Sequence, residues 1–324
     1  MRWLTQICEY YPLSKLCQLS SADITNLLDQ YRQDEGYISS SNEISVPILP
    51  PRRGQITLVG SGPGHPDLLT QAALRAINTA DLVLADKLVP AEILALIPRR
   101  TEVYIARKFP GNAEKAQEEL QSRGLTALHQ GKRVMRLKQG DPYIFGRGGE
   151  EYLFFKSHGY EVDVIPGLTS ALTATALAGI TATHRGVADQ VLICTGTGRR
   201  GALPQPPEYI KSRTAVFLMA LHRVEDLVGS LVGAGWPDDI PCAVVERASC
   251  RDQRVIRTQI KDVAMAIEQE GSRPPGLLVV GWGCRVLKPA DETNKWTVEE
   301  GLDGHFWSTG GDDIVKLGSE GNDV

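Results

Sequence analysis

The sequence has no Cys-x-x-Cys pair and no long apolar run. Its six cysteines are scattered, which is typical of reduced thiols in a cytosolic protein and not of metal ligands or a disulfide scaffold. No apolar stretch approaches the roughly 20 residues that a membrane helix needs, and the N-terminal segment lacks the unbroken apolar core of a secretory signal. These absences predict a cytoplasmic protein that does not enter a membrane and holds no metal.

Excess positive charge is also missing. Lys and Arg total 35 against 39 Asp and Glu, which gives a formal net charge of −4, and no long stretch is basic. A protein that binds duplex nucleic acid needs a basic face, so nucleic acid is not an expected partner. The 324 residues, 42% of them hydrophobic, have an ordinary globular composition and are enough for about two domains with a real core.

Five segments differ in pattern along the chain. The first has helical spacing of its apolar residues, and the second is rich in Ser and Pro, as linkers are. Two longer segments carry strand and helix patterns, and the last is polar and rich in Gly and Asp. We therefore predict a helical segment at 1–36, a linker at 37–54, domains at 55–185 and 186–288, and a disordered tail at 289–324.

The two domains differ in how their strands are connected. In the first, the apolar runs ITLVG, DLVLAD, EVYIA, RVMRLK and EVDVI alternate with helical patterns such as residues 67–80, which predicts parallel β-α units. In the second, QRVIRT follows CAVVE after a short turn, so a mixed sheet is expected. The fold class is a two-domain α/β protein, with a parallel-type sheet first and a mixed sheet second.

A glycine-rich loop, Gly60–His65, connects the first strand to a helix. Glycines there let the backbone approach a ligand closely. One interpretation is a dinucleotide fingerprint with Asp86 on the ribose. Against it, the third glycine position holds His65, and Pro63 removes an N–H donor. A tight turn with only a structural role is the other alternative.

Several longer motifs carry a more specific signal. GSGPGHPDLLT, LVLADKLV, RLKQGDPYIFGRGGEE, IPGLTSALTATALAGITATHRG and ERASCRDQRVI occur in an order that resembles the tetrapyrrole methylase family, over residues 54–288. THRG and GDPYIFGRGGEE are most similar to those members that methylate uroporphyrinogen III at the entry to siroheme biosynthesis. Later cobalamin-pathway methylases and diphthine synthase share the fold but match less well.

The N-terminal segment RWLTQICEYYPLSKLCQLSSADITNLL carries a second, weaker resemblance. It is similar to the helical tail of the dehydrogenase/ferrochelatase module that precedes the methylase in siroheme synthases. That module's nucleotide-binding part is absent here. The resemblance implies a fusion cut short at its N-terminus, with neither dehydrogenase nor chelatase activity.

The resemblance implies transfer of methyl groups from S-adenosylmethionine to two ring carbons of uroporphyrinogen III, giving precorrin-2. The sulfonium methyl is already activated, so the protein must align the acceptor carbon and later remove a proton. The family also implies a homodimer with the cofactor between the domains. Alternatives are a methylase of another precorrin, a non-catalytic remnant and a dinucleotide oxidoreductase.

Asp86 ends the strand LVLAD and matches the family's proposed proton acceptor. Its alternative role, capping the helix after Pro90, is disfavoured because three residues intervene.

The family's basic partner is less certain, since this chain has Ala106-Arg107-Lys108 where the family has Gly-Lys-Arg. Counting from Asp86 places Lys108 at the proton donor, whereas aligning the strand places Arg107 there. Arginine does not release its proton, so only Lys108 could donate one, while Arg107 could bind a carboxylate. Both could instead be solvated surface charges.

The remaining candidates come from the same resemblance. Gln139 departs from the family, which has glycine there, and Ala248 stands where glycine is common. Thr169 could also be a helix cap, and Met219 could be a core residue. The implied cofactor contacts are Gly62, Pro63, Gly64, Gln139, Gly140, Asp141, Ile144, Thr169, Ser170, Met219 and Ala248.

The substrate carries many carboxylates although the chain is net acidic, so local basic residues must recognise it. Arg147 stands among three glycines, which would leave it exposed in the crevice. Arg199 and Arg200 could equally be ordinary surface charge. The expected carboxylate-binding residues are Arg107, Arg147, His184 and Arg185.

Overall fold

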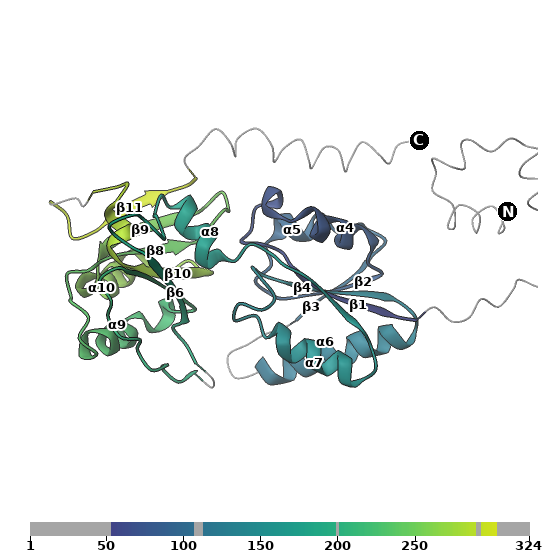
Figure 1. Ribbon diagram of the computed structural model, residues 1–324. Coiled ribbons are helices and arrows are strands. Elements are labelled where there is room, and N and C mark those ends of the chain that lie inside the picture. Colours follow the sequence, from purple (N-terminus) through teal and green to yellow (C-terminus); the bar gives the residue numbers. More distant parts are fainter. Residues whose placement is uncertain (1–52, 107–112, 199–200, 290–292, 303–324) are drawn as a thin grey trace, which may run out of the picture. The chain divides into compact units, whose positions relative to one another are not determined.

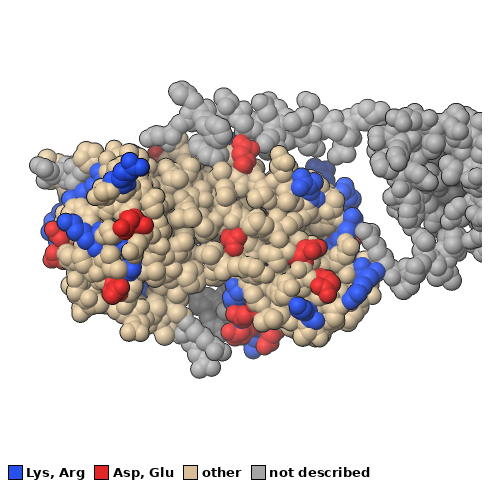
Figure 2. Space-filling model, in the orientation of Figure 1, with Lys and Arg blue, Asp and Glu red and all other residues tan. Residues whose placement is uncertain are grey.

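The computed structural model describes residues 53–106, 113–198, 201–289 and 293–302 (Figure 1). The predicted helical segment 1–36 and nearly all of the linker 37–54 lie outside these residues. Within the described chain no helix is long and apolar enough to cross a bilayer. On the face shown in Figure 2, acidic and basic side chains are interspersed and no broad patch of one sign is visible.

The first domain is built on a five-stranded sheet in the order β3-β2-β4-β1-β5. Every neighbouring pair is parallel, which confirms the predicted β-α alternation. Parallel strands end at the same edge, so the loops after β1, β2, β4 and β5 begin side by side. The elements are β1 (Gln55–Gly60), η1 (Pro66–Leu68), α4 (Gln71–Thr79), β2 (Leu82–Ala85), α5 (Ala91–Leu94), β3 (Glu102–Ile105), α6 (Ala113–His129), β4 (Arg133–Lys138), α7 (Gly148–Ser157) and β5 (Val162–Ile165).

Helices cover both faces of this sheet, with α4 and α5 on one and α6 and α7 on the other (Figure 1). Alternate side chains of β4 point to opposite faces. Met135 and Leu137 pack in the cluster that includes α4 and α5, and Val134 packs with residues of α6 and α7. The helix predicted over 67–80 is divided: α4 begins after Thr70, whose Oγ1 accepts the N–H of Ala73.

The second domain contains a six-stranded sheet in the order β11-β9-β8-β10-β7-β6. Only β6 and β7 pair in parallel, and the hairpin of β8 and β9 confirms the mixed sheet. Helices α9 and α10 pack on one face, and the alanines of α8, a helix inside the segment 55–185 predicted as the first domain, pack on the other. The elements are α8 (Ser170–Leu177), β6 (Gln190–Thr195), β7 (Arg213–Leu218), η3 (Leu221–Arg223), α9 (Val224–Gly233), β8 (Pro241–Glu246), β9 (Arg254–Gln259), α10 (Ile260–Glu270), β10 (Gly276–Val280), η4 (Trp282–Arg285) and β11 (Thr297–Glu300).

The prediction that the chain is disordered from residue 289 onward is wrong for the segment around β11. This strand pairs with β9 and forms the edge of the second sheet. The Thr258 hydroxyl donates to the Lys295 carbonyl at 2.8 Å, and Arg257 pairs with Glu299 at 2.5 Å. The segment has a polar sequence because one side of an edge strand faces solvent, so its apolar periodicity is weak.

Candidate active site

Two of the predicted cofactor loops are bonded to each other by their backbones. The Gly62 N–H donates to the Gly140 carbonyl at 3.2 Å, and the Gly140 N–H donates to the Gly62 carbonyl at 2.9 Å. Both residues have positive φ, +69° and +70°, which L side chains rarely adopt. The loops after β1 and β4 are therefore locked together at the carboxyl edge of the first sheet.

The loop after β5 joins this pair through equally close contacts. A Cβ on Gly167 would lie 2.2 Å from the Gly140 carbonyl oxygen, and one on Gly60 would lie 2.5 Å from it. Asp141 ties the loops further, since Oδ2 accepts the Gly167 N–H at 3.2 Å and Oδ1 accepts the Tyr143 N–H at 2.9 Å. The three loops therefore pack so closely that a side chain at Gly60 or Gly167 would clash with the backbone of Gly140.

Gly140 has open space on its other side. A Cβ there would meet only the Thr169 Cα, at 4.0 Å. Thr169 is the N-cap of α8, and its Oγ1 accepts the Ala171 N–H at 3.3 Å, so the capping role considered from the sequence is present. The open side of Gly140 and the N-terminus of α8, where Ser170 is the first residue, form a backbone-lined cradle.

The second domain reaches this loop cluster through the segment after β8. The His65 N–H donates to the Ser249 Oγ at 2.9 Å. A Cβ on Gly64 would lie 2.7 Å from the Cys250 Sγ, so glycine permits this contact. Ala248 is buried beside Ser249. Met219, which follows β7, is 46% exposed and has a positive φ of 55°, so it is not the core residue that its apolar surroundings allowed.

Asp86 lies at the same edge and belongs to a buried charge network. Its Oδ1 accepts from Arg136 Nη2 at 2.6 Å, and its Oδ2 lies 3.8 Å from Lys138 Nζ. Glu151 Oε1 accepts from Arg136 at 3.0 Å, from Lys138 at 3.0 Å and from Gln117 at 2.7 Å. The side chains of Arg136 and Lys138 are each 2% exposed, and that of Glu151 is 0% exposed. The Asp86 side chain is 16% exposed, so Asp86 is the member of the network nearest to solvent.

Burial and charge act in opposite directions on the two cations. Burial lowers the pKa of Arg136, but Asp86 and Glu151 outweigh it and raise the pKa above the ordinary value. Burial and the neighbouring Arg136 lower the pKa of Lys138, although the two carboxylates oppose this. Arg136 therefore stays charged and holds Asp86, while Lys138 is the easier of the two to deprotonate.

Sequence reasoning missed Arg136, Lys138 and Glu151. The available signal was the pattern of β4, a central strand in which Arg136 and Lys138 share one face with the apolar Val134. A buried cation needs a carboxylate partner, and Glu151 in the GRGGEE motif is close in sequence.

A cavity of about 440 Å³ lies beside Ile144 and Arg147 and is also lined by Ile193 of β6. Arg147 is partly exposed, as its glycine setting predicted, and bonds Glu150 at 2.6 Å and Glu114 at 3.2 Å. The bond to Glu150 is the main cause that raises the pKa of Arg147. The guanidinium beside the cavity therefore stays charged and is held by these two carboxylates.

The structure gives less information about the remaining predicted residues. His184 and Arg185 are exposed in the connection between α8 and β6, where the His184 N–H donates to the Ala188 carbonyl. Arg107, Lys108, Arg199 and Arg200 lie outside the described residues. Among the residues that the structure describes, no three His, Cys, Asp or Glu side chains are grouped as metal ligands.

Comparison with known families defines the class of protein. Residues 55–264 match the family described as Tetrapyrrole (Corrin/Porphyrin) Methylases, and residues 1–36 match Sirohaem biosynthesis protein C-terminal. The chain belongs to the tetrapyrrole methylase family, and both resemblances drawn from its motifs are confirmed.

The relatives are more specific. The chain is 50% identical to a uroporphyrinogen-III C-methyltransferase of Saccharomyces cerevisiae, over 93% of this chain and 55% of that protein. It is 49% identical to a probable uroporphyrinogen-III C-methyltransferase of Schizosaccharomyces pombe, over 89% of this chain and 62% of that protein. The chain thus spans little more than half the length of these curated relatives.

A solved structure is also similar. Uroporphyrin-III C-methyltransferase of Thermus thermophilus, complexed with S-adenyl homocysteine, has a TM-score of 0.63 at 37% identity, covering 72% of this chain and 100% of that one. The likeness extends over both domains of the described fold.

Proposed function

We propose that this protein methylates uroporphyrinogen III at two ring carbons with S-adenosylmethionine as methyl donor, giving precorrin-2 for siroheme biosynthesis. The observation that carries the proposal is the carboxyl edge of the first sheet, where a glycine-built cradle and the Asp86 carboxylate lie side by side. Membership of the tetrapyrrole methylase family and the names of the relatives support the same reaction.

The residues at this edge fit the methyl donor. The open side of Gly140 and the capped start of α8 leave backbone surface that a side chain would fill. We propose that the loops containing Gly62, Pro63 and Gly64 and those containing Gln139, Gly140 and Asp141 hold it, with Ile144, Thr169, Ser170, Met219 and Ala248 around it. When bound, S-adenosylmethionine supplies a methyl group already activated on sulfur.

Asp86 is the proposed proton acceptor that restores the methylated ring. Arg136 binds Oδ1 and keeps the carboxylate at the end of β2, so the base does not need to reorganise during proton transfer. Asp141 orders the cofactor loops through the Gly167 and Tyr143 amides and is proposed to position and not to react.

Lys108 is the proposed proton donor, and Arg107, Arg147, His184 and Arg185 are proposed to bind substrate carboxylates. Arg147 has the best structural support, because it lines the cavity next to Ile144. Lys108→Arg should retain charge but lose most turnover, since guanidinium does not release its proton. Arg107→Lys should mainly raise KM, because a bidentate donor becomes a point charge.

We further propose that the protein works as a cytoplasmic homodimer. Among the described residues Cys194, Cys242, Cys250 and Cys284 are all free thiols, which fits a reducing compartment. Light scattering tests the dimer, and imaging of the tagged full chain tests the compartment.

The decisive experiment incubates the full chain with uroporphyrinogen III and methyl-labelled S-adenosylmethionine, followed by mass spectrometry of the tetrapyrrole. Addition of two methyl groups is expected. Methylation of a different precorrin only would favour the first alternative. Failure to bind S-adenosylhomocysteine in calorimetry would favour a non-catalytic remnant, and NAD(P) binding in its place would favour the oxidoreductase.

A further inference from the structure

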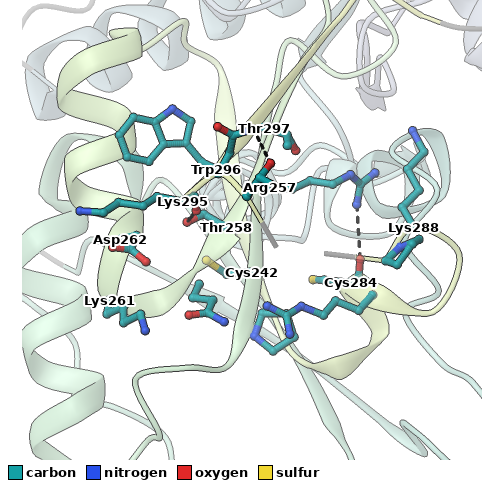
Figure 3. Close-up of a pocket in the computed structure, with 16 residues that line it drawn as sticks. Cys242, Arg257, Thr258, Lys261, Asp262, Cys284, Lys288, Lys295, Trp296 and Thr297 are labelled. Atoms are coloured by element: carbon teal, nitrogen blue, oxygen red, sulfur yellow. Dashed lines mark hydrogen bonds between the residues drawn. The ribbon is translucent and has the colours of Figure 1, made fainter. Parts of the chain in front are cut away.

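A second cavity lies at the other end of the second sheet, away from Met219 and Ala248. β10 is antiparallel to both β7 and β8, so β7 and β8 run in the same direction and both end at the edge that carries Met219 and Ala248. The cavity is lined by Pro241 and Cys242 at the start of β8, and its volume is about 540 Å³. It is therefore separate from the candidate active site, and Figure 3 shows the residues that line it.

The lining of this cavity is strongly basic. Among the described lining residues Asp262 is the one carboxylate. Glu299, just outside, pairs with Arg257 at 2.5 Å and with Lys288 at 2.6 Å. The basic residues of the lining are Arg257, Lys261, Arg285, Lys288 and Lys295.

Three of these cations have no close acidic partner within the part of the chain that the structure describes. Lys261, Arg285 and Lys295 form no ion pair with any residue in the described ranges, whereas Arg257 and Lys288 share Glu299. Like charges gathered in a concave site repel one another, so their arrangement lowers stability unless an anion enters. The concave shape also focuses their field on the space between them.

A helix terminus adds to the same field. α10 begins at this cavity, and its N-cap Gln259 makes no side-chain bond to the first turn. The N-terminal end of a helix carries partial positive charge, which favours an anion nearby. Figure 3 shows Lys261 and Lys295 on the side of α10 and Arg257 and Lys288 on the other side, so basic residues stand on two sides of the cavity.

We propose that this cavity binds a small organic polyanion that carries at least two carboxylate or phosphate groups. Two separated basic walls match a ligand with anionic groups at both ends better than a single inorganic ion. Pro241 and the half-buried Trp296 add apolar surface to the lining, which the ligand's carbon skeleton can contact. The site is distinct from the one that holds the methyl donor and its acceptor.

The test uses the full chain and two probes, pyrophosphate and citrate, titrated separately by calorimetry at low salt. Lys295→Glu and Arg285→Gln remove cavity charge, and Lys156→Glu, on the exposed face of α7, is the matched control. Saturable binding of at least one probe is expected, weakened about tenfold by each cavity variant and unchanged by the control. Preference for pyrophosphate would identify a phosphate ligand, and preference for citrate a polycarboxylate.

Circular dichroism and thermal unfolding establish that each variant is folded, and the bound probe should raise Tm in the wild type and the control only. The proposal is overturned if neither probe binds, or if the folded cavity variants bind as tightly as the control. It is also overturned if the cavity variants change the oligomer mass in light scattering without changing probe affinity, because the charges would then serve assembly. No readout requires methyl transfer, so this outcome is independent of the proposed reaction.

Discussion

The Nη2 atom of Arg136 lies 2.6 Å from Oδ1 of Asp86, and this bond connects two neighbouring strands of the first sheet. In the β2–β4 register Leu84 stands opposite Arg136, and Asp86 lies two residues further along the chain, just past the end of β2. Arg136 also donates to the Leu84 and Leu137 carbonyls and to Glu151. The proposed base is therefore oriented by a cation that is itself held on several sides.

Asp86→Asn should slow methyl transfer about 100-fold or more while leaving S-adenosylhomocysteine affinity nearly unchanged, because the carboxylate acts in the chemical step. Single-turnover kinetics and calorimetry measure the two effects separately. Asp163→Asn, at an exposed position of β5, is the control and should behave as wild type. An unchanged turnover rate in Asp86→Asn would remove the residue from the mechanism.

Arg136→Met should lower the free energy of unfolding by about 3–5 kcal/mol, since it leaves Lys138 alone to balance the buried carboxylates of Asp86 and Glu151. Lys132→Met removes a cation from an exposed pair with Glu102 at 3.2 Å, and should cost less than about 1 kcal/mol. Urea denaturation of both variants provides the comparison. Equal losses would mean that the buried network contributes no more than a surface pair.

Gly167→Ala should destabilise the protein by about 1–3 kcal/mol and weaken S-adenosylhomocysteine binding, because the new Cβ would meet the Gly140 carbonyl at 2.2 Å. Gly149→Ala, inside α7 with nothing within 4 Å of the new Cβ, should instead gain about 0.4–1 kcal/mol. Thermal unfolding and calorimetry measure both quantities. If Gly167→Ala proved as stable and as tight as Gly149→Ala, the three loops would not be in close contact.

Stability should depend on pH through His65, whose pKa burial lowers from 6.5, with Arg251 acting in the same direction and Asp67 opposing. Below pH 6.5 the unfolded chain binds a proton more readily than the folded chain. Stability contributed by this group is therefore lost as the pH falls from 6.5 through the lowered folded pKa.

His65→Asn supplies the comparison for that pH effect, because Asn does not titrate and can accept the Asp67 N–H that His65 Nδ1 accepts at 3.1 Å. Urea denaturation at pH 8 and pH 5 should show a larger loss of stability in the wild type than in the variant. Parallel losses would show that His65 does not contribute to the acid sensitivity.

Much of the first domain could be predicted because local patterns agree with the fold. ITLVG, LVLA and RVMRLK are apolar runs bounded by helical periodicity, and each became a strand at or near its expected limits. β11 could not be predicted in this way. Four residues at a sheet edge give little periodicity, and their place depends on backbone bonds to β9, which comes some forty residues earlier in the chain.

The sequence by itself determined the family, the two kinds of sheet and the glycine loops, because these depend on short-range patterns: strand runs, turns and residues without a Cβ. Only the tertiary structure decided which side chains meet. Arg136, Lys138 and Glu151 lie in β4 and α7, and Asp86 directly follows β2. Burial made their pairing necessary, because an isolated charge in the core is far more costly than a paired one. The basic cavity at the start of α10 likewise arises from residues spread over β9, η4 and the segment before β11, and no local pattern in the sequence brings these together.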